Sequence, residues 1–158
     1  MKLSLPKQAV VRTRWTLLAT VLVASGGAAL AQSTPQGRWK TIDDNTGEAK
    51  SEVVISESNG VLNGRIDKLL RKDADQNGKC EKCTDDRKDK PTVGLEILRG
   101  AKKAEGKDVW EGGKIVDPES GTIYSARLTP IDGGRKLEMR AFVGMALLGR
   151  TQTWVRVP

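Results

Sequence analysis

Two runs of alternating apolar and polar residues, joined by Asn59-Gly60, constrain the fold of this chain more than any other feature. The first run spans residues 51–58 and has Val53 and Ile55 on one face, and the second spans residues 61–70. Asn and Gly readily adopt the positive φ angles of a two-residue hairpin turn. The pattern therefore predicts a β-hairpin and, with it, an antiparallel sheet.

Similar short runs recur along the chain, and no long stretch has apolar residues at helical spacing. Turn signals at 117–121 and 132–134 separate some of them, and residues 143–148 are expected to form a short helical turn or a bend. Further strands are predicted at 37–42, 92–98, 108–116, 122–129, 135–142 and 149–157. Eight strands joined mostly by hairpins predict an all-β fold, a single antiparallel up-and-down β-barrel, because closure removes both exposed edges.

The first 31 residues are expected to be a secretory signal peptide. Four basic residues precede an uncharged apolar run at 15–24, and small residues at 29 and 31 predict cleavage between Ala31 and Gln32. The apolar run is shorter than the roughly 20 residues that a membrane-spanning helix needs. Residues 32–158 are therefore predicted to form one periplasmic or secreted domain, with no membrane span after cleavage.

The charge of the predicted mature domain argues against nucleic acid as a partner. The chain has 27 Lys and Arg against 20 Asp and Glu, and four of the bases lie in the leader, which leaves 23 bases against 20 acids. Their signs alternate, whereas a nucleic-acid binder clusters its bases and interleaves aromatic residues. Nothing in the sequence indicates an oligomeric state.

Residues 72–90 form a long charged segment without apolar periodicity, and we expect it to lie over one end of the barrel. It contains both cysteines of the chain, Cys80 and Cys83. Export to an oxidising compartment favours a structural disulfide over a redox dithiol or half of a metal site. A ring this small contributes at most about 2 kcal/mol through loop-closure entropy, so we expect it to shape the tip of the loop.

The same segment resembles the first half of a calcium-binding EF-hand loop. Its Asp-x-Asp-x-Asn-Gly motif places oxygen ligands at alternate positions, but the twelfth position is Thr84 where a bidentate Glu belongs. A plain polar turn is the alternative. A weak calcium site, the only cofactor considered, would use Asp73, Asp75, Asn77, Glu81 and Asp85.

The residue types that usually carry catalysis are poorly represented. The chain has no histidine, which removes the usual general base and the commonest metal ligand. The adjacent acids at 43–44 and 85–86 lie in expected loops and are interpreted as solvated turn residues. No catalytic residue is predicted, and an enzyme is the least favoured functional hypothesis.

Several motifs in order resemble the bacterial DUF2147 family of small exported proteins of unknown function. They are Gly37-Arg38-Trp39 with Asp43, Cys80-x-x-Cys83, Val93-Gly94-Leu95-Glu96-Ile97, the run from Gly113 to Tyr124 and the run from Leu148 to Arg156. The resemblance implies a lipocalin-like or calycin-like barrel and no particular activity. In lipocalins, a Trp in a similar Gly-x-Trp opening plugs the barrel base under an Arg from the last strand, a role open here to Arg150 or Arg156.

Two functions remain for such a barrel. An eight-stranded barrel can hold one small ligand, and the first hypothesis is that it binds a small apolar or amphipathic molecule of the cell envelope. The alternative is a structural or protein-interaction module whose barrel is filled by side chains. The candidate ligand-binding residues are Trp110, Tyr124, Arg127 and Arg150. Arg127 lies on the strand face opposite the apolar set, so the favoured alternative for it is a position facing water.

Overall fold

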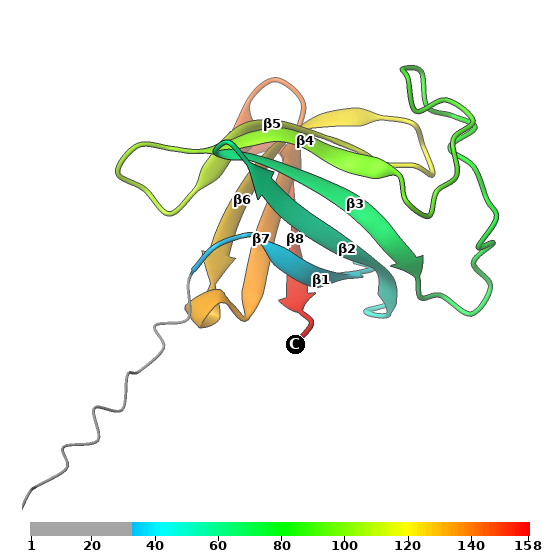
Figure 1. Ribbon diagram of the computed structural model, residues 1–158, viewed down its shortest axis with the longest axis horizontal. Helices are drawn as coiled ribbons and strands as arrows, with labels where there is room; N and C mark the ends of the chain where they lie inside the picture. Colours follow the sequence, from blue (N-terminus) through cyan, green and yellow to red (C-terminus); the bar gives the residue numbers. More distant parts are fainter. Residues whose placement is uncertain (1–32) are drawn as a thin grey trace, which may run out of the picture.

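The protein is an eight-stranded antiparallel β-barrel, seen in a computed structural model that describes residues 33–158 (Figure 1). The predicted signal peptide and its Ala31–Gln32 cleavage site lie outside the described residues. The strands are β1 (Gly37–Ile42), β2 (Ala49–Ser58), β3 (Val61–Leu69), β4 (Glu96–Lys103), β5 (Trp110–Val116), β6 (Ile123–Ile131), β7 (Lys136–Phe142) and β8 (Arg150–Arg156).

Each strand pairs with the next one in sequence, and β1 pairs with β8 to close the barrel. The closing ladder is short, since it pairs only Trp39 with Arg156 and Lys40 with Val155. Short 3-10 turns occupy Asp132–Gly134 and Ala146–Leu148. The predicted fold class and the turn expected at 143–148 are confirmed. No helix among residues 33–158 has the length and apolar character to cross a membrane.

The prediction for the fourth strand was wrong by several residues. Residues 92–98 were expected to be extended and residue 100 to begin a turn, but β4 starts at Glu96 and continues through Gly100. Leu98 and Ala101 pair with positions two residues apart on β3, so one extra residue on β4 forms a bulge. Gly100, with φ of 78°, supplies the positive φ angle there, and its amide donates to the Asn63 side chain.

Inward-facing side chains fill one half of the barrel. Val53, Ile55, Ala126 and Leu128 are buried, as the alternating pattern predicts. Two tryptophans and four leucines have no more than 1% exposure: Trp39, Trp154, Leu62, Leu98, Leu128 and Leu137. Such close packing leaves no space for a ligand in this part of the interior, and Trp154 lies at its boundary with the other half.

The closed end of the barrel is sealed by Trp39 and Arg156. The Arg156 guanidinium lies 4.1 Å from the centre of the Trp39 ring, and the indole N–H donates to the Pro35 carbonyl at 2.7 Å. Gly37 is required beside them, because its φ is 125° and a Cβ atom would lie 2.4 Å from Arg156 Nη1. Of the two arginines considered from the sequence, Arg156 is therefore the one over the tryptophan.

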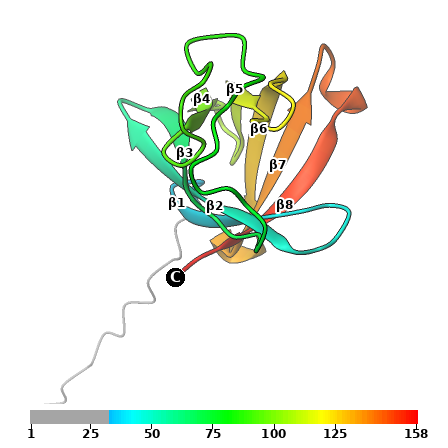
Figure 2. The same cartoon turned by 90° about the vertical axis from the view of Figure 1, so that its right-hand side faces the viewer.

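Four connections gather at the opposite, open end (Figure 2). They are the β1–β2 loop at 43–48, the long β3–β4 segment at 70–95, the β5–β6 turn at 117–122 and the β7–β8 loop at 143–149. We call residues 70–95 the mouth loop. It folds back beside the β5–β6 turn, as the sequence led us to expect of a segment over one end.

Candidate ligand-binding site at the open end

A cavity of about 550 Å³ lies at the open end of the barrel. Its inner wall takes one apolar or aromatic side chain from each of six successive strands: Ile66, Ile97, Ile115, Tyr124, Met139 and Trp154. These side chains point inward because they alternate with outward-facing residues along each strand. The volume falls within the range of roughly 300–1,000 Å³ that is usual for small-molecule sites.

A few polar groups stand among these apolar side chains. The hydroxyls of Thr41 and Ser51 lie 2.8 Å apart in the cavity wall and are buried. Tyr124, half-buried in the same wall, adds a third hydroxyl-bearing side chain. An apolar wall with a few convergent polar groups is the arrangement that binds and orients an amphipathic molecule.

Charged side chains cross the entrance on one side. Glu119 of the β5–β6 turn accepts hydrogen bonds from Lys50 at 2.8 Å and from Arg71 of the mouth loop. Arg71 also lies 3.9 Å from Asp43. Hydrogen bonds from the backbone amides of Asn45 and Thr46 hold the pKa of Asp43 below its ordinary value, and the charge of Arg71 contributes less. All four side chains are solvent-accessible, so these contacts can open with little cost.

A second polar contact lies on the other side of the entrance. Asp44 accepts a hydrogen bond from Gln152 at 3.0 Å and lies 3.6 Å from Arg150. Gln152 and Arg150 both line the cavity. The entrance is thus bordered by both signs of charge, with Arg150 mostly exposed.

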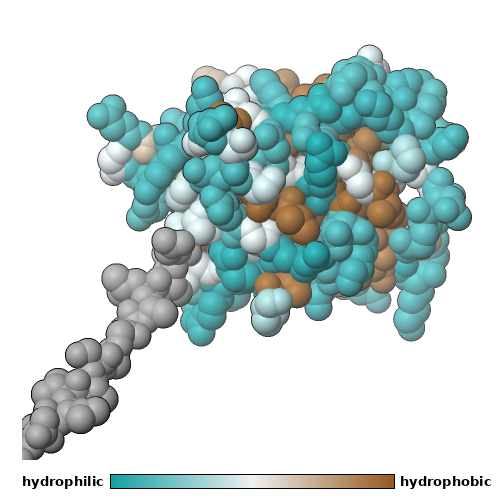
Figure 3. All heavy atoms as spheres, in the orientation of Figure 1, coloured by the Kyte–Doolittle hydropathy of each residue, from teal (hydrophilic) through white to brown (hydrophobic). Residues whose placement is uncertain are grey.

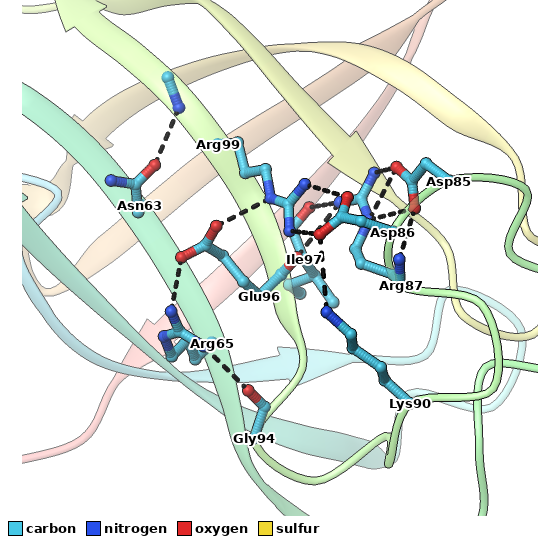
Figure 4. Close-up of polar contacts among 11 residues, drawn as sticks. Asn63, Arg65, Asp85, Asp86, Arg87, Lys90, Gly94, Glu96, Ile97 and Arg99 are labelled. Carbon is cyan, nitrogen blue, oxygen red and sulfur yellow. Dashed lines mark hydrogen bonds and ion pairs between the residues drawn. The ribbon is translucent and has the colours of Figure 1, made fainter.

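Ion pairs fasten the mouth loop to the barrel wall (Figure 4). Arg99 of β4 donates to both oxygens of Asp86 at 2.7 and 2.9 Å, and to Glu96 at 2.8 Å. Glu96 in turn accepts from Arg65 of β3 at 2.8 Å. The paired arginine lowers the pKa of Asp86 to about 2. Asp86 is an exposed turn acid, as the sequence led us to expect, and its ion pair with Arg99 was not predicted.

Arg87 anchors the same loop from within. Its side chain is 3% exposed and donates to Asp85 and to the carbonyls of Glu96 and Ile97. Hydrogen bonds from Arg87 hold the pKa of Asp85 below its ordinary value. Sequence reasoning missed this residue because Arg87 stands in a run of charged residues with no apolar pattern to mark it as buried.

The Cys80–Cys83 disulfide is present and buried against the β5–β6 turn. A Cβ atom on Gly121 of that turn would lie 1.9 Å from the Lys82 carbonyl oxygen, so the two backbones are in direct contact. The disulfide therefore packs where the mouth loop meets the barrel. The expectation that it shapes the tip of the loop did not include this contact with the barrel.

The five candidate calcium ligands are not gathered into one cluster. Within residues 33–158, no three His, Cys, Asp or Glu side chains lie close enough together to hold a metal ion. The Asp75 carboxylate accepts from the amide of Asn77 at 2.9 Å, and Asp85 is already paired with Arg87. Calcium binding stays a prediction, and it would require Asp73, Asp75, Asn77, Glu81 and Asp85 to rearrange.

The four candidate ligand-binding residues divide into two groups. Tyr124 and Arg150 line the cavity. Trp110 is buried outside it with Lys103 over its ring, 5.2 Å from the ring centre. Arg127 lies on the outer wall and pairs with Glu111 at 3.2 Å. The alternation of β6 predicts this outward position, since Arg127 stands between the buried Ala126 and Leu128.

Comparison with known proteins agrees with this architecture. A family model described as "Uncharacterized protein conserved in bacteria (DUF2147)" matches residues 37–156. The chain belongs to the DUF2147 family. The family match begins at the Gly-x-Trp motif of the closed end and finishes at Arg156, so it spans the whole barrel. Among curated proteins, no relative was found.

A solved structure shares the fold of this DUF2147 protein. It is described as "Protein HP1028 from the human pathogen Helicobacter pylori belongs to the lipocalin family". The two chains are 22% identical, with a TM-score of 0.66, and the match covers 78% of this chain and 82% of HP1028. At this level of identity the likeness shows a lipocalin-like fold and nothing of a ligand.

Proposed function

We propose that this protein binds one small apolar or amphipathic molecule in the cavity at the open end of its barrel. The observation that carries the proposal is the division of the interior into a tightly packed half and a half that retains about 550 Å³. The apolar tail of a ligand would lie against Ile115, Met139 and Trp154, and its polar end would face the charged entrance.

The proposed site of action is the cell envelope or the exterior. Two features support export: the leader-like sequence of residues 1–31, and a buried disulfide, which is usual in oxidising compartments. Mass spectrometry of the amino-terminal peptide of the protein recovered from cells would test this, and it also detects the cyclised form of an amino-terminal glutamine. Export predicts an amino-terminus at Gln32, whereas a chain that retains its leader would contradict it.

Ligand binding can be tested with dodecanoate as the probe and with a variant that fills the cavity. Ala141 lines the cavity, and Ala141→Trp places an indole in the space that a ligand tail would occupy. Ala104→Trp, in the β4–β5 turn at the opposite end of the barrel, is the matched control. We expect Ala141→Trp to weaken dodecanoate binding at least about tenfold and Ala104→Trp to leave it unchanged.

Native mass spectrometry of protein isolated from its own envelope gives an independent readout. A bound small molecule that is lost in the Ala141→Trp variant would support the proposal and identify the ligand. If the wild-type barrel carries no ligand and also fails to bind dodecanoate, the proposal is rejected in favour of a structural or protein-interaction module.

A further inference from the structure

The β7–β8 loop carries an unusual set of exposed apolar side chains. Four large ones stand in residues 143–148, and their exposed fractions are 69% for Val143, 64% for Met145, 82% for Leu147 and 78% for Leu148. Large aliphatic side chains scattered singly on a surface are ordinary, but a contiguous group marks an interaction site. Apolar spheres are visible at the upper edge of Figure 3, where Figure 1 draws this loop.

The backbone of this loop is fixed in a shape that leaves the side chains outside. Arg140 donates to the carbonyls of Ala146 at 2.6 Å and Leu147 at 3.0 Å. The amides of Leu148 and Gly149 donate back to Met145 and Ala146. Several of the loop's polar backbone groups are therefore paired within the protein, which lowers the cost of placing the loop in an apolar environment.

The strands that carry the loop are basic, and the nearest acid paired with them is Asp44 of the β1–β2 loop, 3.6 Å from Arg150. Arg140 and Arg150 flank the loop, and residues 139–158 contain no Asp or Glu. On the neighbouring strand pair, Lys114 is exposed beside Ser125, which pairs with Phe142 at the base of the loop. Apolar side chains with basic residues behind them match the interface of an anionic bilayer, where tails and negatively charged headgroups meet.

We propose that the β7–β8 loop docks the protein on an anionic lipid surface, with Leu147 and Leu148 entering the interface and Arg150 contacting headgroups. The loop borders the cavity, which Ala141, Arg150 and Gln152 line. Docking would therefore bring the open end of the barrel to the membrane. The inference does not depend on a ligand, since it rests on the loop alone.

Vesicle cosedimentation tests this directly. The chain from Gln32 to Pro158 contains every strand of the barrel, and we expect it to sediment with vesicles of equimolar phosphatidylglycerol and phosphatidylethanolamine. The double variant Leu147→Asp with Leu148→Asp should bind at least about tenfold more weakly, because burial of two aliphatic side chains is lost and anionic groups are added. Its fold should be intact, since both side chains point into solvent.

Two variants that each remove one positive charge test the electrostatic contribution to vesicle binding. Arg150→Gln should weaken binding a few-fold to anionic vesicles and leave binding to neutral phosphatidylcholine vesicles unchanged. Lys107→Gln, which removes the same charge from the β4–β5 turn at the other end of the barrel, should change neither.

Three outcomes would overturn the proposal: no binding by the wild-type protein, equal binding by the double aspartate variant, or Arg150→Gln and Lys107→Gln weakening binding alike. A concentration-dependent dimer that the double variant abolishes, without vesicle binding, would reassign the loop to contact between copies.

Discussion

Arg156 shows how one residue secures the closed end of the barrel. Its guanidinium donates to the carbonyls of Thr34, Gln36 and Gly134 and covers the Trp39 ring. It thereby links the segment before β1 to the β6–β7 turn, beside the seam where the ladder between β1 and β8 is shortest. Desolvation lowers the pKa of Arg156, but its three carbonyl acceptors keep the charge solvated by protein.

Replacing this residue should destabilise the whole fold. We expect Arg156→Ala to lower the free energy of unfolding by about 2–4 kcal/mol, because three carbonyls lose a charged donor. Arg156→Lys should recover only part of this, since an ammonium group cannot reproduce the planar fork. Arg135→Ala is the control, with an expected loss below about 0.5 kcal/mol because that side chain is 78% exposed. Urea unfolding measures all three, and equal losses for Arg156 and Arg135 would contradict the assignment.

The sequence could restrict this role to Arg150 or Arg156 but could not choose between them. Arg150 begins and Arg156 ends the same alternating run. Which of the two arginines covers Trp39 depends on the register of β8 against β1. That register is set by long-range closure, in which Trp39 pairs with Arg156. The alternating pattern of β8 fixes which face each residue occupies but not which residue lies opposite Trp39 on a strand more than 100 residues away.

At the scale of elements, local pattern predicted seven strands closely and failed at β4. Strands next to hairpin turns, such as β2 and β3, end where Asn59 and Gly60 adopt positive φ angles. Gly100 has a positive φ angle too, but it forms a bulge inside a strand. A glycine that permits both a turn and a bulge cannot be assigned until its partner strand is known.

The mouth loop should respond to acid through Asp86. Its pKa is lowered from 3.8 to about 2 by Arg99. A carboxylate with a lowered folded-state pKa stabilises the fold above its unfolded pKa, and this contribution disappears as the pH falls through the folded value. Asp86→Asn should therefore melt below wild type at pH 6, and the difference should vanish as the pH falls from about 4 to 2.

Amide hydrogen exchange in the mouth loop gives a local readout of the same pair. Exchange in residues 85–90 should be faster in Asp86→Asn than in wild type at pH 6. Asp108→Asn, another exposed acid paired with a basic side chain, is the control, since Asp108 bonds Lys103 within the β4–β5 turn. A melting difference for Asp86→Asn that persists unchanged at pH 2 would contradict the role of this ion pair.

At the scale of the whole molecule, the barrel separates a stabilising half from a half that is open. The sequence indicated that an eight-stranded barrel can be filled by side chains or can hold a ligand. It could not say which half is full, because this depends on how Trp39, Trp154 and the leucines from different strands share one interior.

This division can be measured by comparing two buried positions. Leu128 is fully buried in the packed half, so Leu128→Ala should leave a new void and lower the free energy of unfolding by about 3–5 kcal/mol. Ile115 is almost as buried but lines the existing cavity. Ile115→Ala only enlarges a space that is already present, and we expect a loss of about 1–2 kcal/mol.

Dodecanoate affinity should depend more on Ile115 than on Leu128, the reverse of the order expected for stability. Ile115→Ala removes part of the surface that a ligand tail would contact, so it should weaken dodecanoate binding, whereas Leu128→Ala should alter affinity little when the protein is kept well below its melting temperature. Urea unfolding and a binding titration on the same two variants give both quantities. Equal stability losses at the two positions would show that the open half is packed as tightly as the closed half, and the partition of the barrel would then be wrong.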